Sequence, residues 1–190
     1  MQQQLVNYLG LLYPIPAADE ETISSYFEPR SCKEGAILYP GNGICTELYF
    51  ICSGILRIFS YNDKGVEITY YFYKENQLCT ILPGFTDGSK AEAGIRAACD
   101  AEVLVISRNK MDALCGKLPY IKELMEQIHQ QRVMEKLRTR HTYIGEDAET
   151  QYKLFVMSQP DIALRVPVKD IASYLGITPQ SLSRIRKNIR

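Results

Sequence analysis

Residues 168–189 read VKDIASYLGITPQSLSRIRKNI, and this stretch determines how the rest of the chain is interpreted. Ile171 and Leu175 lie one helical turn apart, and Gly176 ends that predicted helix. The Thr178-Pro179 pair can cap and open a second helix. The stretch therefore predicts two short helices around a three-residue turn, which is a helix-turn-helix.

The second predicted helix has an apolar and a polar side. Leu182, Ile185 and Ile189 share one face, and the small Ala172 of the first helix lets the two helices cross closely. The other positions of the second helix and its cap are expected to contact DNA: Thr178, Gln180, Ser181, Ser183, Arg184 and Lys187. Gln180 and Arg184 are one turn apart and suited to bases, whereas Thr178, Ser183 and Lys187 are suited to phosphates.

The alternative for this stretch is an ordinary helical hairpin with a basic surface. From Pro160 onward the chain carries six basic and two acidic side chains, a local net charge of +4. Residues 1–118 carry ten basic and fourteen acidic side chains, a net charge of −4. The charge asymmetry favours the DNA-binding interpretation and limits it to the C-terminal part.

The composition indicates a cytoplasmic protein with a substantial core. The chain has 190 residues, a formal net charge of zero and 46% hydrophobic residues, which suits two small domains. Its six cysteines are widely spaced without a C-x-x-C pair, so we expect reduced thiols and no metal site. No signal peptide and no apolar run of about 20 residues is found, so we expect a soluble protein without a membrane partner.

The N-terminal part predicts two short helices followed by a β domain. The helices lie around Leu5–Leu12 and from Asp19 onward, with Pro14, Pro16 and Pro29 between and after them. Short runs rich in Tyr, Phe, Ile and Val then alternate with glycine and polar turns. The expected strands are Ala36–Tyr39, Leu48–Cys52, Ile55–Tyr61, Val66–Tyr73, Gln77–Thr80, Ile95–Ala98 and Val103–Ser107.

Seven short strands at this spacing predict an antiparallel β-roll of the double-stranded β-helix or jelly-roll type, because an aromatic sheet needs its second face covered. The many tyrosines are expected to pack on the pleated sheet, and a tyrosine-lined ligand site is the alternative. The fold class is thus α+β, with the roll followed by a long helix and an all-α helix-turn-helix domain.

After Lys110 the pattern is helical. Met111–Leu118 predicts a short helix, and Pro119 opens a long one that ends near Arg140. Residues 146–157 predict a further helix, and residues 160–167 a linker into the helix-turn-helix. The apolar stripe of the long helix predicts a homodimer seam, although a helix packed on its own roll would show a similar face. The expected seam residues are Ile121, Leu124, Met125 and Ile128.

The expected organisation has three parts: a sensor roll with flanking helices (1–118), a dimerisation helix (119–143) and a DNA-binding domain (144–190). This order resembles the Crp/Fnr family of bacterial transcription regulators over essentially the whole chain. The residues that carry the resemblance are Lys33-Glu34-Gly35-Ala36-Ile37-Leu38, Gly41, Leu48-Tyr49-Phe50-Ile51, Ser53-Gly54, Gly65-Val66-Glu67 and the segment 166–185. Residues 166–185 are similar to a subgroup common in Bacteroidetes. The resemblance implies a dimer that binds inverted-repeat promoter DNA and works with RNA polymerase.

The effector segment departs from that family. Members that bind cyclic nucleotides have a Gly-Glu-Leu/Ala segment for the ribose and an Arg-Ser/Thr-Ala segment whose arginine pairs with the phosphate. The corresponding stretches here run from Gln77 to Gly84 and across 91–93, so that Glu92 stands where a cation is needed. Cyclic AMP is therefore not expected, and the effector pocket is open to an unknown small molecule. Its expected residues are Leu82, Gly84, Lys90, Glu92 and Arg96.

Other functions are poorly supported. The roll contains no histidine, since His129 and His141 both lie on the long helix, so neither a cupin metal site, nor a haem ligand, nor a Ser-His or Cys-His nucleophile is expected there. Cys32, Cys45 and Cys52 are not spaced for an iron–sulfur cluster. We expect no enzyme and no catalytic residue. The remaining alternative is a ligand-binding or interaction module whose helix-turn-helix no longer reads DNA, which the short or absent wing after the second helix keeps open.

Overall fold

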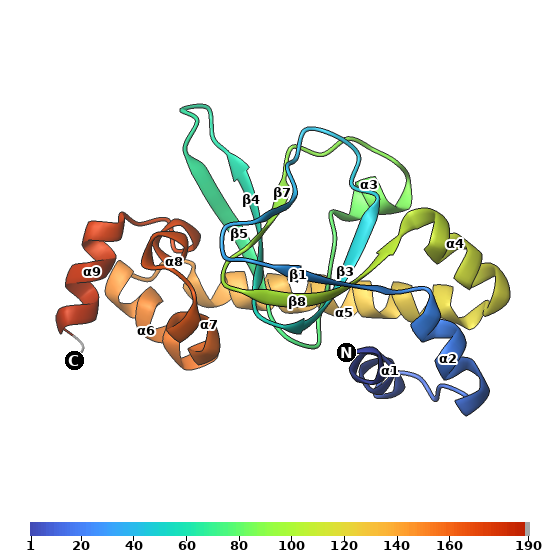
Figure 1. Cartoon of the computed structure of the whole chain (residues 1–190). Coiled ribbons are helices and arrows are strands. Elements are labelled where there is room, and N and C mark those ends of the chain that lie inside the picture. Colours follow the sequence, from blue (N-terminus) through green and yellow to red (C-terminus); the bar gives the residue numbers. More distant parts are fainter. Residues whose placement is uncertain (189–190) are drawn as a thin grey trace.

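The computed structural model describes residues 1–188, and Ile189 and Arg190 lie outside the described residues. Helices stand at both ends of the chain and the strands lie between them (Figure 1). The helices before and within the roll are α1 (Gln2–Gly10), α2 (Ala17–Ser25) and α3 (Leu82–Thr86). The later ones are α4 (Arg108–Lys117), α5 (Tyr120–Tyr143), α6 (Ala148–Ser158), α7 (Pro160–Arg165), α8 (Val168–Tyr174) and α9 (Pro179–Asn188).

The strands form two antiparallel sheets, as the roll prediction requires. The first sheet has the order β1-β8-β3-β6 and the second β2-β7-β4-β5. The strand bounds are β1 (Glu28–Cys32), β2 (Ile37–Tyr39), β3 (Glu47–Ser53), β4 (Leu56–Tyr61), β5 (Glu67–Tyr73), β6 (Leu78–Cys79), β7 (Gly94–Ala97) and β8 (Ala101–Ser107). All seven predicted strands form, each within two residues of its expected bounds, so the predicted β-roll is confirmed.

Three elements differ from the sequence expectations. β1 was not predicted, because four of its five side chains are exposed and Pro29 disrupts the pattern; an edge strand tolerates that proline. The short helix α3 was not predicted, because Pro83 and Gly84 obscured it. Residues 160–167 were expected to be a linker, but Pro160 opens α7, whose Ile162 and Ala163 are buried.

The roll has one core between its sheets and another outside the first sheet. Tyr49 and Ile51 of β3 face the second sheet, whereas Phe50 faces the helices α1, α2, α4 and α5. The first sheet is thus covered on both faces, which explains why β3 reads as an uninterrupted apolar run. The helix-turn-helix lies at the opposite end of the molecule from α1, α2 and α4 (Figure 1).

The C-terminal helices share a third core with the roll. This core contains Phe155, Ile171 and Leu182 of the C-terminal helices together with Ile55 and Phe72 of the roll. The expected DNA-binding domain therefore packs directly on the second sheet. Within residues 1–188, no helix is both long and apolar enough to cross a lipid bilayer.

Candidate nucleic-acid interface and effector region

The helix-turn-helix is formed by α8, a short turn and α9. Gly176 supplies the left-handed residue of the turn with φ of 70°, a conformation that other residues adopt only with strain. The Ser181 backbone N–H donates a 3.1 Å hydrogen bond to Thr178 Oγ1, so Thr178 caps α9 as predicted. The two helices are in direct contact, and the fully buried Ala172 of α8 lets them approach closely.

Helix α9 presents its polar face to solvent. Leu182 is fully buried and Ile185 packs beside it on the shared core. The six predicted DNA-contact side chains, Thr178, Gln180, Ser181, Ser183, Arg184 and Lys187, are all exposed. Thr178 and Ser181 also lie within 3.0 Å of each other through their hydroxyl groups at the start of the helix. α9 stands at the outer end of the molecule, away from the roll (Figure 1).

The charge of α9 suits a polyanion. The sequence of α9 contains Arg184, Arg186 and Lys187 and no acidic residue. The two acidic residues of the C-terminal segment are directed elsewhere: Asp161 pairs with Lys74 of the roll, and Asp170 is buried. The exposed side chains of α9 thus combine basic groups with hydrogen-bonding groups that can reach base edges.

The five predicted effector residues differ in their surroundings, and one of them, Arg96, is directed elsewhere. Leu82 is half-buried, while Lys90 and Glu92 are exposed. A Cβ on Gly84 would lie 2.6 Å from the Cys45 backbone nitrogen, so α3 packs directly on the segment that precedes β3. The Arg96 side chain lies on the outer face of the second sheet, where its guanidinium binds the Glu67 carboxylate at 2.8 Å. The expectation that Arg96 belongs to an effector pocket is therefore wrong, because β7 directs it to the outer face of the second sheet.

The charges of this region bear on how an anionic ligand would be received. Glu92 is an exposed acid in the loop before β7, and the Arg96 guanidinium is paired with Glu67. A phosphate there would meet a carboxylate in place of a bidentate guanidinium.

Helix α5 places a lysine, Lys136, against two tyrosines of the roll, a contact that the sequence did not predict. The Lys136 ammonium lies 4.9 Å from the ring centroid of Tyr71 and 5.0 Å from that of Tyr73, which is cation–π geometry. Burial lowers the pKa of Lys136, and burial raises the pKa of Tyr71 to about 12. The side chain of Lys136 thus occupies the space beside the two tyrosines. Only its position among apolar residues of a long helix could have indicated this contact.

The predicted dimer seam is wrong in its residues. Ile121 and Leu124 are each 1% exposed and Ile128 is 4% exposed, because all three pack on the protomer's own core. Met125 packs against the same core. The stripe that was expected to face a partner is therefore the face that attaches α5 to its own roll.

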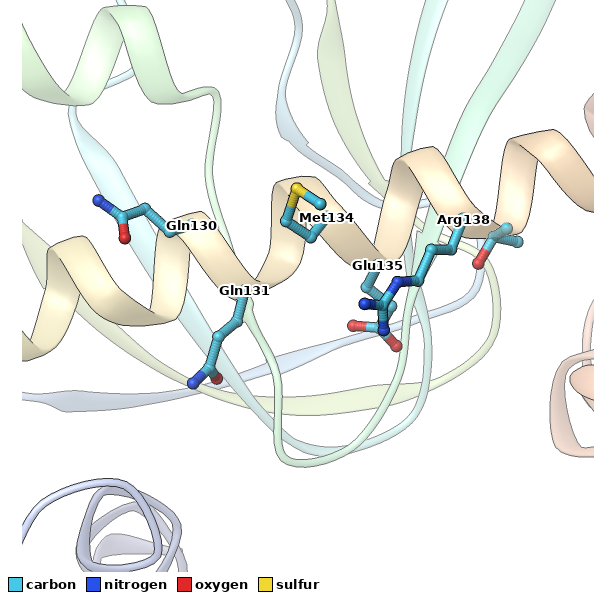
Figure 2. A pocket seen from close by; sticks show the side chains of 6 residues that line it. Gln130, Gln131, Met134, Glu135 and Arg138 are labelled. Carbon is cyan, nitrogen blue, oxygen red and sulfur yellow. The ribbon is translucent and has the colours of Figure 1, made fainter.

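A different stripe of α5 is exposed. Met134 and Leu137 are each 53% exposed and Val133 is 38% exposed, at the i, i+1, i+4 spacing of one helix face. A shallow hollow of about 450 Å³ lies along this part of α5 and is lined by side chains of that helix alone (Figure 2). Its lining residues are Gln130, Gln131, Met134, Glu135, Arg138 and Thr139. The large apolar side chains of α5 before residue 129 thus pack on the roll, whereas those at Val133, Met134 and Leu137 are exposed.

Comparisons with known proteins agree with this architecture. Residues 29–117 match the family model described as the cyclic nucleotide-binding domain. FixK2 from Bradyrhizobium japonicum superposes with a TM-score of 0.71 at 16% identity, over 86% of this chain and 84% of that one. The c-di-GMP responsive regulator CLP from Xanthomonas campestris gives 0.70 at 15% identity, over 92% and 91%. A putative Crp/Fnr regulator from Eubacterium rectale gives 0.67 at 22% identity, over 96% and 87%. No curated protein matches the sequence.

These matches agree with the fold described above, in which a β-roll similar to the cyclic nucleotide-binding domain is joined to C-terminal helices. The chain has the fold of Crp/Fnr transcription regulators over nearly its whole length, so the predicted fold is confirmed, while the likeness of residues 166–185 to a Bacteroidetes subgroup stays a prediction.

Proposed function

We propose that this chain is a sequence-specific DNA-binding transcription regulator of the Crp/Fnr type. The observation that carries the proposal is the exposed face of α9, which combines Gln180 and Arg184 one turn apart with a basic last turn. A glutamine suits adenine and an arginine suits guanine, each through two hydrogen bonds in the major groove. We assign the base contacts to Gln180 and Arg184 and the phosphate contacts to Thr178, Ser183 and Lys187, with Ser181 beside them.

The regulator acts as a homodimer whose partners meet along α5. The exposed Val133, Met134 and Leu137 form the seam, in place of the buried residues first expected. Burial of such side chains contributes roughly 1.5 to 3 kcal/mol each before the cost of association, so several on each protomer can support a dimer. A two-fold dimer reads an inverted repeat with half-sites about 10 base pairs apart, centre to centre.

The roll acts in this regulator without cyclic nucleotide, since its effector loop presents Glu92 and its Arg96 is paired with Glu67. The proposed partners are double-stranded DNA, a second copy of the chain and, as for other promoter-binding regulators, RNA polymerase in the cytoplasm. The chain is proposed as a non-enzymatic regulator.

The test is selection of binding sites from random DNA by the purified full chain, followed by titration at two or more salt concentrations. A selected inverted repeat and an affinity that falls steeply with salt are expected. If no sequence is enriched and no footprint forms at low salt, the helix-turn-helix belongs to a ligand-binding or interaction module instead.

A further inference from the structure

The junction between the roll and the helix-turn-helix contains a buried group of charges. Arg57 of β4 and Arg96 of β7 stand directly opposite each other on neighbouring strands. Glu67 of β5 binds both of them, Arg57 in close contact and Arg96 at 2.8 Å. Asp170 of α8 adds the fourth charge, with Oδ2 3.4 Å from Arg57 Nε. We call these four residues the interdomain cluster.

The interdomain cluster is electrically balanced only when α8 is docked. Like charges directly opposite each other on a sheet are destabilising, and Glu67 supplies one negative charge for the two guanidinium groups. The second negative charge, on Asp170, comes from the helix-turn-helix. Arg57 is 2% exposed and Asp170 is 7% exposed, so both charges have left water. A buried charge that loses its partner is costly, which makes the docked position of α8 specific.

A second set of contacts fixes α8 along β5. The Thr69 backbone N–H donates a 2.9 Å hydrogen bond to Ser173 Oγ, and that hydroxyl donates at 3.2 Å to the Glu67 carbonyl. Ser173 therefore uses both of its hydrogen-bonding functions on the free edge of the second sheet. Close to this edge, Arg165 of α7 binds Glu75 of the roll at 2.6 Å.

Apolar contacts complete the junction. The Tyr174 ring of α8 packs on Phe72 of the roll at a centroid distance of 5.3 Å and on Phe155 of α6 at 5.7 Å. The docked position leaves α9 on the side of the helix-turn-helix that faces away from the roll, with its polar face exposed (Figure 1).

We infer that the interdomain cluster holds the helix-turn-helix in its DNA-binding orientation in the chain without any bound effector. This inference rests on the proposed DNA-binding function. The roll is then a fixed support for α9, and the charge pair between Arg57 and Asp170 replaces the ligand-dependent positioning that an effector would supply. Loss of the pair leaves the oriented state only fractionally populated, and the apparent affinity for DNA falls by that fraction.

The test uses Asp170→Asn, which keeps the shape of the side chain and removes its charge. Removing this negative charge raises the net charge of the proposed DNA-binding domain by one unit, which by itself should strengthen binding to a polyanion. The inference predicts the opposite, a loss of roughly tenfold on the operator selected by the unmodified chain. Glu149→Gln is the matched control, because Glu149 lies on α6 of the same domain and its carboxylate pairs with Lys153 of the same helix, with no ion pair to the roll among the described residues. Glu75→Gln breaks a second contact of the junction and is expected to act like Asp170→Asn.

Hydrogen exchange at the Thr69 amide measures how often the junction opens, because that N–H is bonded to Ser173, and the measurement needs no DNA. Circular dichroism and near-normal protection in β3 and β8 establish that each variant is folded. The expected result is Thr69 exchange at least tenfold faster in Asp170→Asn and Glu75→Gln, and unchanged in Glu149→Gln. Unchanged Thr69 exchange in both junction variants overturns the inference. So does faster exchange with an affinity equal to or higher than that of Glu149→Gln, since the cluster would then not orient α9 for DNA. If the unmodified chain binds no DNA, the proposed function fails, and Thr69 exchange still decides whether the cluster holds the junction closed.

Discussion

Arg57 in the β-roll lies 3.4 Å from Asp170 in the helix-turn-helix, and the two side chains are almost fully buried between two parts of the chain that are far apart in sequence. Burial raises the pKa of Asp170, with Arg57 opposing the shift. The Arg57 guanidinium offsets only part of the cost of burying this carboxylate. The contact joins the roll and the C-terminal helices into one structural unit.

Two of the three basic residues of α9, Arg184 and Lys187, should have different roles. Arg184→Ala is expected to cost about 1 to 3 kcal/mol on the selected operator and much less on random DNA, because it removes a base contact. Lys187→Ala should weaken binding to both and reduce the salt slope by about one unit, because it removes a phosphate contact. Titrations of both variants at several salt concentrations check this. An equal loss on specific and random DNA for Arg184→Ala would mean that this side chain does not read bases.

The exposed stripe of α5 should determine the oligomeric state. Met134→Asp combined with Leu137→Asp is expected to give a folded monomer, because charges at these positions oppose burial against a second α5. Sedimentation at several protein concentrations measures the change. Leu124→Asp is the contrasting variant: Leu124 is 1% exposed, so a charge there should unfold the roll instead of separating two folded protomers. A double variant that remains dimeric would place the seam on another surface.

Cyclic AMP should not bind the roll, and it should not change the affinity of the chain for DNA. A ligand present at about 100 times its dissociation constant adds ~2.7 kcal/mol to the free energy of unfolding. Thermal melting with millimolar cyclic AMP should show no such stabilisation, since Glu92 and the paired Arg96 leave the phosphate without its cation. AMP is the control nucleotide. A reproducible increase in melting temperature with cyclic AMP but not with AMP would contradict the prediction.

The free energy of unfolding should fall in acid partly because the Glu47 carboxylate becomes protonated. Hydrogen bonds from Arg30 hold the pKa of the Glu47 carboxyl below its ordinary value of 4.5, with Tyr49 as a second donor. A carboxyl whose pKa is lowered in the folded state contributes stability above the unfolded pKa and loses it as the pH falls through the folded pKa. The free energy of unfolding of Glu47→Gln should therefore decrease less steeply below about pH 4.5 than that of the unmodified chain. Urea titrations between pH 3 and 7 measure the two slopes, and identical slopes would show that the Arg30 contact is not kept in solution.

Local patterns predicted the elements well and their partners less well. The turn at residues 62–65 can be read from the sequence because turn chemistry is local: the Asn62 side chain accepts hydrogen bonds from the backbone N–H groups of Lys64 and Val66, and Gly65 takes the left-handed conformation. The helix-turn-helix was identified for the same reason, through Gly176 and the Thr178 cap. The apolar stripe of α5 showed which side chains are buried but not against what, because periodicity is the same for a partner helix and for the protomer's own roll.

The side chains that join the two parts of the chain could not be predicted in this way. Arg57 alternates with apolar residues in β4 and reads as an ordinary outward-facing charge, and Asp170 reads as an ordinary first-turn acid of α8. Their contact depends on how the helix-turn-helix docks on the second sheet, which is a tertiary relationship without a local signal. The same holds for Lys136, whose contact with Tyr71 and Tyr73 requires α5 to cross the roll.

The docking of α8 also protects the roll from self-association. β5 is the last strand of its sheet and is rich in tyrosine, and a flat, aromatic strand edge with free N–H and C=O groups can pair with a second chain. Ser173 takes up the Thr69 N–H and the Glu67 carbonyl on that edge. A roll produced without its C-terminal helices would expose this edge, so these helices also serve as a cover against intermolecular β-pairing.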